Sequence, residues 1–257
     1  MMEAKVIVEA KDLTMNYHTL DGETAAIKDL NLQVYEGEFV SIIGPSGCGK
    51  STLLSLIAGL LTPSNGAVLV KGEVVSGPNP NVGYMPQRDQ LFPWRNILNN
   101  VLIGLEVQHK LNDETREKAK ELLSTYGLGD FIHHYPNQLS GGMRQRAALI
   151  RTLAINPEIL LLDESFSALD YQTRLAVSDE VRSIIYKEKK TSILVTHDIA
   201  EAISMSDRII VLTKRPATVK NIHEIRLSCD ELSPIKRREA PEFRSYFNQI
   251  WKELDVK

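Results

Sequence analysis

The hydrophobic residues of this chain follow two patterns that alternate along much of its length. Residues 39–43, 159–162 and 192–196 form short apolar runs, which are typical of strands buried on both faces of a parallel sheet. Between these runs, apolar residues recur at helical spacing, which predicts helices over 50–61 and around 177–185. Because strand and helix alternate in the second half of the chain, we expect right-handed βαβ units there.

The opening third of the chain favours strands and turns. Residues 30–34 alternate apolar and polar side chains, and residues 6–10, 67–70 and 82–85 are also strand-like. Residues 63–66 read Pro-Ser-Asn-Gly, a set of turn formers that should end the helix predicted before them.

The pattern becomes helical from about residue 93. One amphipathic helix lies around 119–126, with Asn112 or Asp113 as a suitable N-cap, and Ser140 can cap another helix. The sequence therefore predicts a helical subdomain inserted between two halves of a sheet domain.

These patterns divide the chain into three parts. Residues 1–92 and 157–212 form the sheet domain, residues 93–156 form the helical subdomain, and residues 213–257 form a C-terminal extension. The extension shows no periodicity from which helices or strands can be predicted.

The composition is that of an ordinary globular protein. Of the 257 residues, 43% are hydrophobic and 25% are charged, which is enough to bury a core without disulfides or metals. The formal net charge of -3 lacks the basic excess of nucleic-acid-binding domains, so we expect no nucleic-acid partner. The two cysteines, Cys48 and Cys229, lie far apart in the sequence and fit a reducing, cytosolic compartment.

Hydropathy argues against a membrane span within the chain. No apolar run approaches the ~18 residues of a spanning helix. Residues 1–10 contain Glu3 and Lys5 and lack the apolar core of a signal peptide. A role at a membrane would therefore require partner subunits that hold the protein there.

A glycine-rich loop at residues 44–51 carries the first chemical motif. It reads Gly-Pro-Ser-Gly-Cys-Gly-Lys-Ser, matches G-x-x-x-x-G-K-[ST], and lies between a predicted strand and a predicted helix. Its backbone N–H groups can surround phosphate oxygens, and the helix N-terminus favours an anion. Lys50 would reach the β- and γ-phosphates of ATP, and the Ser51 hydroxyl would bind Mg²⁺. The flanking strand and helix disfavour the alternative, a glycine-rich turn with a surface lysine.

The whole loop is expected to contact the nucleotide. Its binding residues are Gly44, Pro45, Ser46, Gly47, Cys48, Gly49, Lys50, Ser51 and Thr52. Because Cys48 lies inside this loop, we also expect its alkylation to inhibit ATP hydrolysis.

An acidic pair follows the apolar run at 159–162. Asp163 is expected to hold Mg²⁺, and Glu164 is expected to polarise the attacking water as a general base. Both would emerge at the carboxyl end of a strand, where ligands of such sheets bind. Strand ends are often acidic without a catalytic reason. The acidic pair therefore indicates a catalytic site only together with the phosphate loop.

A second potential anion site lies at residues 139–146, which read Leu-Ser-Gly-Gly-Met-Arg-Gln-Arg. The Ser140 hydroxyl and the N–H groups of Gly141 and Gly142 would lie at the start of a helix. A capped helix after a Gly-Gly turn is the alternative. However, Leu-Ser-Gly-Gly followed by Gln-Arg resembles the signature of the ATP-binding cassette (ABC) family, and it lies between the two motifs above, as in that family.

The resemblance covers roughly residues 6–212 and implies an ATPase that drives transport across a membrane. It implies an α/β fold: a P-loop NTPase core with a mixed sheet flanked by helices, an antiparallel β subdomain and an inserted helical subdomain. In the family, two cassettes pack head to tail. Ser140, Gly141 and Gly142 are therefore expected to bind ATP held by Lys50 of a second copy, in a homodimer or a dimer with another cassette.

Four further positions match elements of the family. Gln87 matches the Q-loop glutamine, which contacts Mg²⁺ or the lytic water, and His197 matches the switch histidine, which contacts the γ-phosphate. Asp170 ends a D-loop that runs along the dimer interface. Tyr17 matches the aromatic residue that stacks on adenine, although a tyrosine near a strand end often has only a packing role. The resemblance implies that the catalytic residues are Lys50, Gln87, Glu164 and His197, and that the Mg²⁺ ligands are Ser51, Gln87 and Asp163.

The resemblance also implies partners and a location. Such a cassette works at the cytoplasmic face of the plasma (inner) membrane with integral permease subunits and, in importers, a separate substrate-binding protein. The permease is expected to dock near Gln87 and Trp94, because an exposed aromatic residue is a suitable interface anchor. The alternative is that Trp94 packs in the core of the helical subdomain.

Residues 90–101 narrow the branch of the family. Gln-Leu-Phe-Pro-Trp-Arg-Asn-Ile followed by Asn-Asn-Val resembles the nitrate, sulfonate and taurine importer group. Importers of thiamine-precursor pyrimidines, cyanate or bicarbonate share this pattern, so the substrate stays open. Three alternatives remain: a soluble cassette ATPase not coupled to transport, a cassette for lipid or metal export, and another P-loop enzyme such as a kinase.

Overall fold

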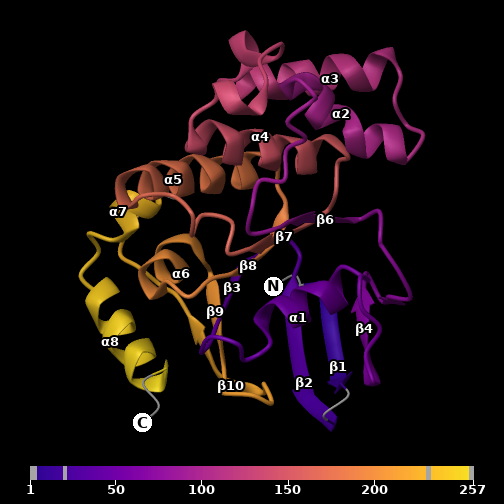
Figure 1. Ribbon diagram of the computed structural model, residues 1–257. Helices are drawn as coiled ribbons and strands as arrows, with labels where there is room; N and C mark the ends of the chain where they lie inside the picture. The colour runs from indigo at the N-terminus through magenta and orange to yellow at the C-terminus, as the bar shows by residue number, and fades with distance from the viewer. Residues whose placement is uncertain (1–4, 20–21, 230–232, 255–257) are drawn as a thin grey trace.

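The strands of the computed structural model form two sheets across the described residues 5–19, 22–229 and 233–254 (Figure 1). The larger sheet has six strands in the order β10-β9-β3-β8-β7-β6. They are β3 (Phe39–Ile43), β6 (Val82–Met85), β7 (Ile159–Asp163), β8 (Thr191–Val195), β9 (Arg208–Leu212) and β10 (Val219–Glu224). All neighbours are parallel except β9 and β10, so the expected mixed sheet is confirmed.

Helices cover both faces of this sheet. The helices of the described residues are α1 (Lys50–Ile57), α2 (Ile97–Val107), α3 (Asp113–Thr125), α4 (Gly141–Ala154), α5 (Tyr171–Lys187), α6 (Ile199–Met205), α7 (Pro234–Arg237) and α8 (Phe243–Leu254), with short 3-10 turns at Gly129–Phe131 and Pro136–Gln138. Ile159 and Leu161 of β7 pack in the core cluster that contains α1, whereas Leu160 and Leu162 pack in the cluster that contains α4 and α5. Burial on both faces explains why these strands are continuous apolar runs.

The smaller sheet is antiparallel throughout, in the order β2-β1-β4-β5. Its strands are β1 (Val6–Thr19), β2 (Gly22–Tyr35), β4 (Asn65–Val70) and β5 (Glu73–Val74). The sequence predicted only short parts of β1 and β2, but each strand is 14 residues long. Shifts in register between Ala10 and Leu13 and between Leu13 and Met15 break the two-residue alternation, which concealed the full length of β1.

The turn predicted at residues 63–66 is partly wrong. Asn65 and Gly66 belong to β4, and Asn65 pairs with Thr14 of β1. Gly66 has a φ of 77°, and a Cβ at this position would lie 2.3 Å from the carbonyl oxygen of Asp12. Glycine is therefore needed here because the two strands approach closely, and the residue does not mark a turn.

Helix α1 ends at Ile57, four residues before the predicted end at Leu61. Gly59 follows the C-cap residue Ala58 and has a φ of 73°, the left-handed conformation that terminates many helices. Leu60 and Leu61 continue the apolar spacing in the sequence but lie beyond the helix.

The helices α2, α3 and α4 lie together at one end of the molecule, away from the smaller sheet (Figure 1). The predicted caps are present. The backbone N–H of Thr115 donates to Asn112 Oδ1 at 2.9 Å, and the backbone N–H of Met143 donates to Ser140 Oγ at 3.3 Å. These caps fix where α3 and α4 begin.

The C-terminal extension is folded onto the core, which the sequence did not predict. Arg237 of α7 is buried, and its Nη2 donates to the carbonyl oxygen of Ser206 at 2.7 Å. His223 Nε2 of β10 lies 2.9 Å from Glu253 Oε2 of α8. Residues 230–232 and 255–257 of the extension, and residues 1–4, where no signal peptide was expected, lie outside the described residues. Within the described ranges, no helix is both long and apolar enough to cross a membrane.

Candidate functional site

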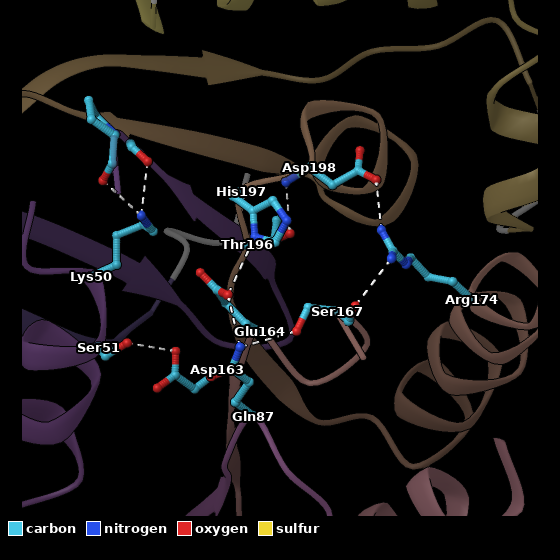
Figure 2. A network of polar contacts seen from close by, with 12 residues as sticks. Lys50, Ser51, Gln87, Asp163, Glu164, Ser167, Arg174, Thr196, His197 and Asp198 are labelled. Carbon is cyan, nitrogen blue, oxygen red and sulfur yellow. Dashed lines mark hydrogen bonds and ion pairs between the residues drawn. The ribbon is translucent and has the colours of Figure 1, made fainter. Parts of the chain in front are cut away.

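Four chain segments meet at one edge of the larger sheet. The strands β3, β8, β7 and β6 are parallel neighbours, so their carboxyl ends lie at the same edge. The segments that leave these ends carry the phosphate loop and the residues expected to be catalytic. Figure 2 shows that Lys50, Gln87, Glu164 and His197, which are far apart in the sequence, are brought together there. This edge is where ligands of open α/β sheets bind.

The phosphate loop turns tightly around the side chain of Lys50. Gly47 and Gly49 have φ values of 72° and 121°, which residues with side chains rarely adopt. Lys50 Nζ donates to the carbonyl oxygens of Gly44 at 2.9 Å and Pro45 at 3.1 Å, and the residue is only 6% exposed. An ammonium group has three donors, so these bonds leave a third for an oxygen of a bound phosphate.

Asp163 accepts hydrogen bonds from two hydroxyl groups. Ser51 Oγ donates to Oδ1 at 3.0 Å, and the hydroxyl of Tyr84 in β6 donates to Oδ2 at 3.0 Å. Burial raises the pKa of Asp163, and both hydrogen bonds oppose that rise. Ser51 and Asp163 thus present adjacent hard oxygen donors, which fit a Mg²⁺ ion. The contact from Tyr84 was not predicted, because a tyrosine within a strand is usually a packing residue.

Glu164 lies where the chain leaves β7 and bends sharply. Its φ of 45° is strained for a residue other than glycine, and its N–H donates to the carbonyl oxygen of Val195 at 2.8 Å. Its Oε2 lies 3.4 Å from Gln87 Nε2 and 3.4 Å from His197 Nδ1 (Figure 2). The strained bend therefore holds a carboxylate where an amide and an imidazole converge.

A cavity opens beside these residues. It is lined by Tyr17, Ala26, Ser46, Gly47, Gly49, Lys50, Ser51, Thr52, Glu164 and Arg215. The Oη of Tyr17 and the Oγ1 of Thr52 are 3.1 Å apart, which brings β1 next to the phosphate loop. Ala26 and Arg215 were missed by sequence reasoning. Arg215 lies in the unassigned extension, and an alanine carries no chemical signal.

The signature residues Ser140, Gly141 and Gly142 do not line this cavity. They begin α4, which packs on the opposite face of the sheet from α1. A Cβ on Gly142 would lie 3.0 Å from Val177 Cγ2, so glycine lets the start of α4 approach α5 closely. Ser140 is exposed, so its hydroxyl is open to a ligand from outside the chain.

Two other expected residues have different surroundings from those anticipated. Cys48 is 1% exposed, and burial raises the pKa of its thiol. Because alkylation needs an accessible thiolate, the structure contradicts the basis for expecting a reactive Cys48. Asp170 lies outside the cavity, and its Oδ1 caps α5 by accepting from the N–H of Thr173 at 3.1 Å.

Comparison with known proteins decides the family. A family model described as ABC transporter matches residues 27–167, which is more than half of the chain. The chain belongs to the ABC transporter family. It is 47% identical to the ABC transporter ATP-binding protein YtlC of Bacillus subtilis (strain 168), over 95% of this chain and 94% of that protein. It is 39% identical to the nitrate import ATP-binding protein NrtD of Synechocystis sp., over 95% of this chain and 93% of that protein.

Solved structures of ABC cassettes have the same fold. The dimeric cassette MJ0796, in a post-hydrolysis state bound to ADP and Pi, is 34% identical with a TM-score of 0.73, covering 86% of this chain and 99% of that one. CbiO1 of Clostridium perfringens, part of the cbiONQ transporter complex, is 26% identical with a TM-score of 0.74, covering 86% and 89%. The expected P-loop cassette fold is confirmed, and this ABC cassette is an ATPase that binds ATP.

A buried carboxyl group lies behind the turn that carries His197. Glu201, in the first turn of α6, is 4% exposed, and its Oε1 has no hydrogen-bond partner among the described residues. Burial raises the pKa of Glu201 to about 7, helped by Asp198 and opposed by Thr196, Arg174 and Arg238. This cassette therefore has a group that titrates near neutral pH next to its site.

We predict that Glu201→Gln flattens the dependence of stability on pH. The folded protein binds the proton of Glu201 up to about pH 7, whereas the unfolded chain loses it near 4.5, so its contribution to stability falls as pH rises between these values. Relative to the wild type, the variant should gain up to about 3 kcal/mol between pH 5 and pH 8. Urea unfolding at both pH values measures this, and parallel pH curves for the two proteins would contradict it.

Proposed function

We propose that this ATPase is the nucleotide-binding subunit of an importer and that it hydrolyses ATP at the sheet edge described above. The observation that carries the proposal is the convergence of Lys50, Asp163, Glu164 and His197 from the ends of three parallel strands, β3, β7 and β8. Lys50 would bind the β- and γ-phosphates, and the N–H groups of residues 44–52 would surround them.

Glu164 would act as the general base. Its carboxylate borders the cavity that Lys50 also lines, so a water between them could lose its proton to Glu164 as it attacks the γ-phosphate. His197 and Gln87, each 3.4 Å from that carboxylate, would orient the water and the phosphate oxygens. Positioning of this kind is the main contribution a protein makes to phosphoryl transfer.

A Mg²⁺ ion would be held by Ser51, Asp163 and Gln87. The hydroxyl of Ser51 already lies 3.0 Å from the carboxylate of Asp163. When bound, the ion would neutralise charge on the β- and γ-phosphates. The contact from the Tyr84 hydroxyl would keep the Asp163 carboxylate oriented toward Ser51.

Each ATP would be shared by two copies of the chain. Ser140, Gly141 and Gly142 do not line the cavity of their own chain, so we expect them to contact a nucleotide held by a partner copy. The dimeric state of the similar cassette MJ0796 supports this arrangement. Tyr17 would stack on the adenine, and Asp170 and the loop before it would face the dimer interface.

Transport is supported by the relatives and by an exposed aromatic surface. Similar proteins include nitrate and bicarbonate transport ATP-binding proteins, which makes a small solute such as nitrate, sulfonate or taurine the proposed cargo. Trp94 is 71% exposed and packs against Phe92, with ring centroids 5.1 Å apart. Asn100, buried in α2, accepts from the N–H of Phe92 at 2.6 Å and holds this segment in place.

The surface around Trp94 and Gln87 would be the docking site for permease subunits. These subunits would hold the chain at the cytoplasmic face of the membrane, and a separate protein would bind the substrate.

We propose that the chain divides into a core at 1–92 and 157–212, a helical subdomain at 93–156 and an extension at 213–257.

We predict that Glu164→Gln lowers kcat for ATP hydrolysis by about 100-fold or more, because the variant lacks the base but can still bind ATP. The variant should accumulate as an ATP-bound dimer on gel filtration. Glu158→Gln, at the opposite end of β7, is the matched control and should hydrolyse ATP normally. Normal hydrolysis by Glu164→Gln would refute the assignment of the base.

We predict that Trp94→Ala lowers co-purification with the permease subunits of the same transporter by about tenfold or more, as expected for an interface anchor. The ATPase activity of the isolated chain should not change. Trp251→Ala removes the other tryptophan, which is 55% exposed on α8, and should leave assembly intact. Unchanged assembly of Trp94→Ala would refute the docking surface. A chain that hydrolyses ATP but associates with no permease would favour an ATPase that is not coupled to transport.

A further inference from the structure

Arg174 in the first turn of α5 joins two loops of the site that are distant in the sequence. Its Nη2 donates to the carbonyl oxygen of Ser167 at 3.3 Å (Figure 2) and to that of Leu169 at 3.0 Å. Its Nη1 lies 3.5 Å from Asp198 Oδ2, and its side chain is 22% exposed. A cation in the first turn opposes the helix macrodipole, so helix stability alone does not account for an arginine here.

On one side, Arg174 contacts the turn that carries His197. Asp198 is the N-cap of α6, and its Oδ1 accepts from the N–H of Glu201 at 3.0 Å. The N–H of Asp198 donates to Thr196 Oγ1 at 3.0 Å. His197 lies between Thr196 and Asp198, so the carboxylate bound by Arg174 belongs to the turn that directs the imidazole toward Glu164.

On the other side, Arg174 contacts the loop that follows Glu164. The N–H of Ser167 donates to the carbonyl oxygen of Glu164 at 3.0 Å, which closes a tight turn directly after the strained residue. Ser167 Oγ also accepts from Gln87 Nε2 at 3.3 Å. The carbonyl groups bound by Arg174 therefore belong to the loop that holds Glu164 and Gln87 in position.

We propose that Arg174 is a positioning residue that holds the His197 turn and the 167–170 loop in one arrangement around Glu164. A planar guanidinium can donate in two directions at once, which a lysine ammonium on a flexible stem cannot do with the same geometry. The inference rests on the proposed roles of Glu164 and His197, but Arg174 itself does not contact the reacting atoms. Arg174 acts through Asp198 on one side and through backbone carbonyls on the other.

The test is steady-state ATP hydrolysis by the full-length chain with four changes: Arg174→Gln, Arg174→Lys, Asp198→Asn and the double variant Arg174→Gln/Asp198→Asn. Asp198→Asn removes the ion pair but keeps an N-cap acceptor for α6. Arg174→Gln should lower kcat by about 10- to 100-fold, as expected for misplaced catalytic groups. The KM for ATP should stay within about threefold, because the phosphate loop is untouched. Arg174→Lys should recover part of the lost kcat.

The double variant separates a shared role from two independent ones. Because Arg174→Gln already removes the ion pair with Asp198, the double variant should be no slower than Arg174→Gln alone. Arg208→Gln is the matched control. Arg208 is similarly covered, and its Nη1 binds Glu38 Oε1 at 3.0 Å and the Gln33 carbonyl at 3.3 Å at the opposite edge of the sheet. Its loss should leave kcat unchanged.

Three results would overturn the proposal. The first is a kcat of Arg174→Gln within about twofold of the wild type. The second is that the losses of kcat from the two single variants multiply in the double variant. The third is a loss of kcat accompanied by a lower Tm and a weaker affinity for ATP, as from general unfolding. Glu164→Gln assayed in parallel keeps the two proposals separate. If Glu164→Gln hydrolyses ATP normally, the assignment of Glu164 as the base fails. The effect of the Arg174 variants is still measured, because their kcat is compared only with that of the wild type.

Discussion

The register of the parallel strands β3, β8, β7 and β6 is the constraint on which the site depends. Ile193 of β8 pairs with Val40 on one side and Leu161 on the other, and Leu161 pairs with Tyr84 of β6. These pairings align four strand ends at one edge. A slip of one residue would turn every side chain of a strand to the opposite face, so the buried apolar residues on both faces oppose it. The packing of the core and the alignment of the catalytic side chains therefore depend on the same strand register.

Much of the site could be predicted because its signals are local. A glycine-rich loop between a strand and a helix specifies a phosphate site within a few residues, and the caps at Asn112 and Ser140 are likewise set by neighbouring N–H groups. No local sequence pattern predicts that Gln87, Glu164 and His197 lie close together. Their proximity followed from the family resemblance, and in the structure it results from the parallel order of the strands.

The features that escaped prediction depend on contacts between distant residues. The length of β1 was concealed by its register shifts, and Gly66 resembled a turn although it permits two strands to approach. The extension after residue 212 is ordered by contacts such as that between Arg237 and Ser206, and a sequence pattern does not show them. Cys48 appeared reactive from its motif, yet the fold buries it. Arg174 and Arg215 carry no motif, and only the assembled fold brings them to the site.

We propose that one ATP lies between Lys50 of one copy and Ser140 of another. Mixing Lys50→Met chains with Ser140→Arg chains tests it most directly, because each variant alone would break both sites of its homodimer. A mixed dimer would contain one intact site, so we expect the mixture to hydrolyse ATP well above the mean of the two separate variants. Activity equal to that mean, with mixed dimers shown to form, would contradict the shared site.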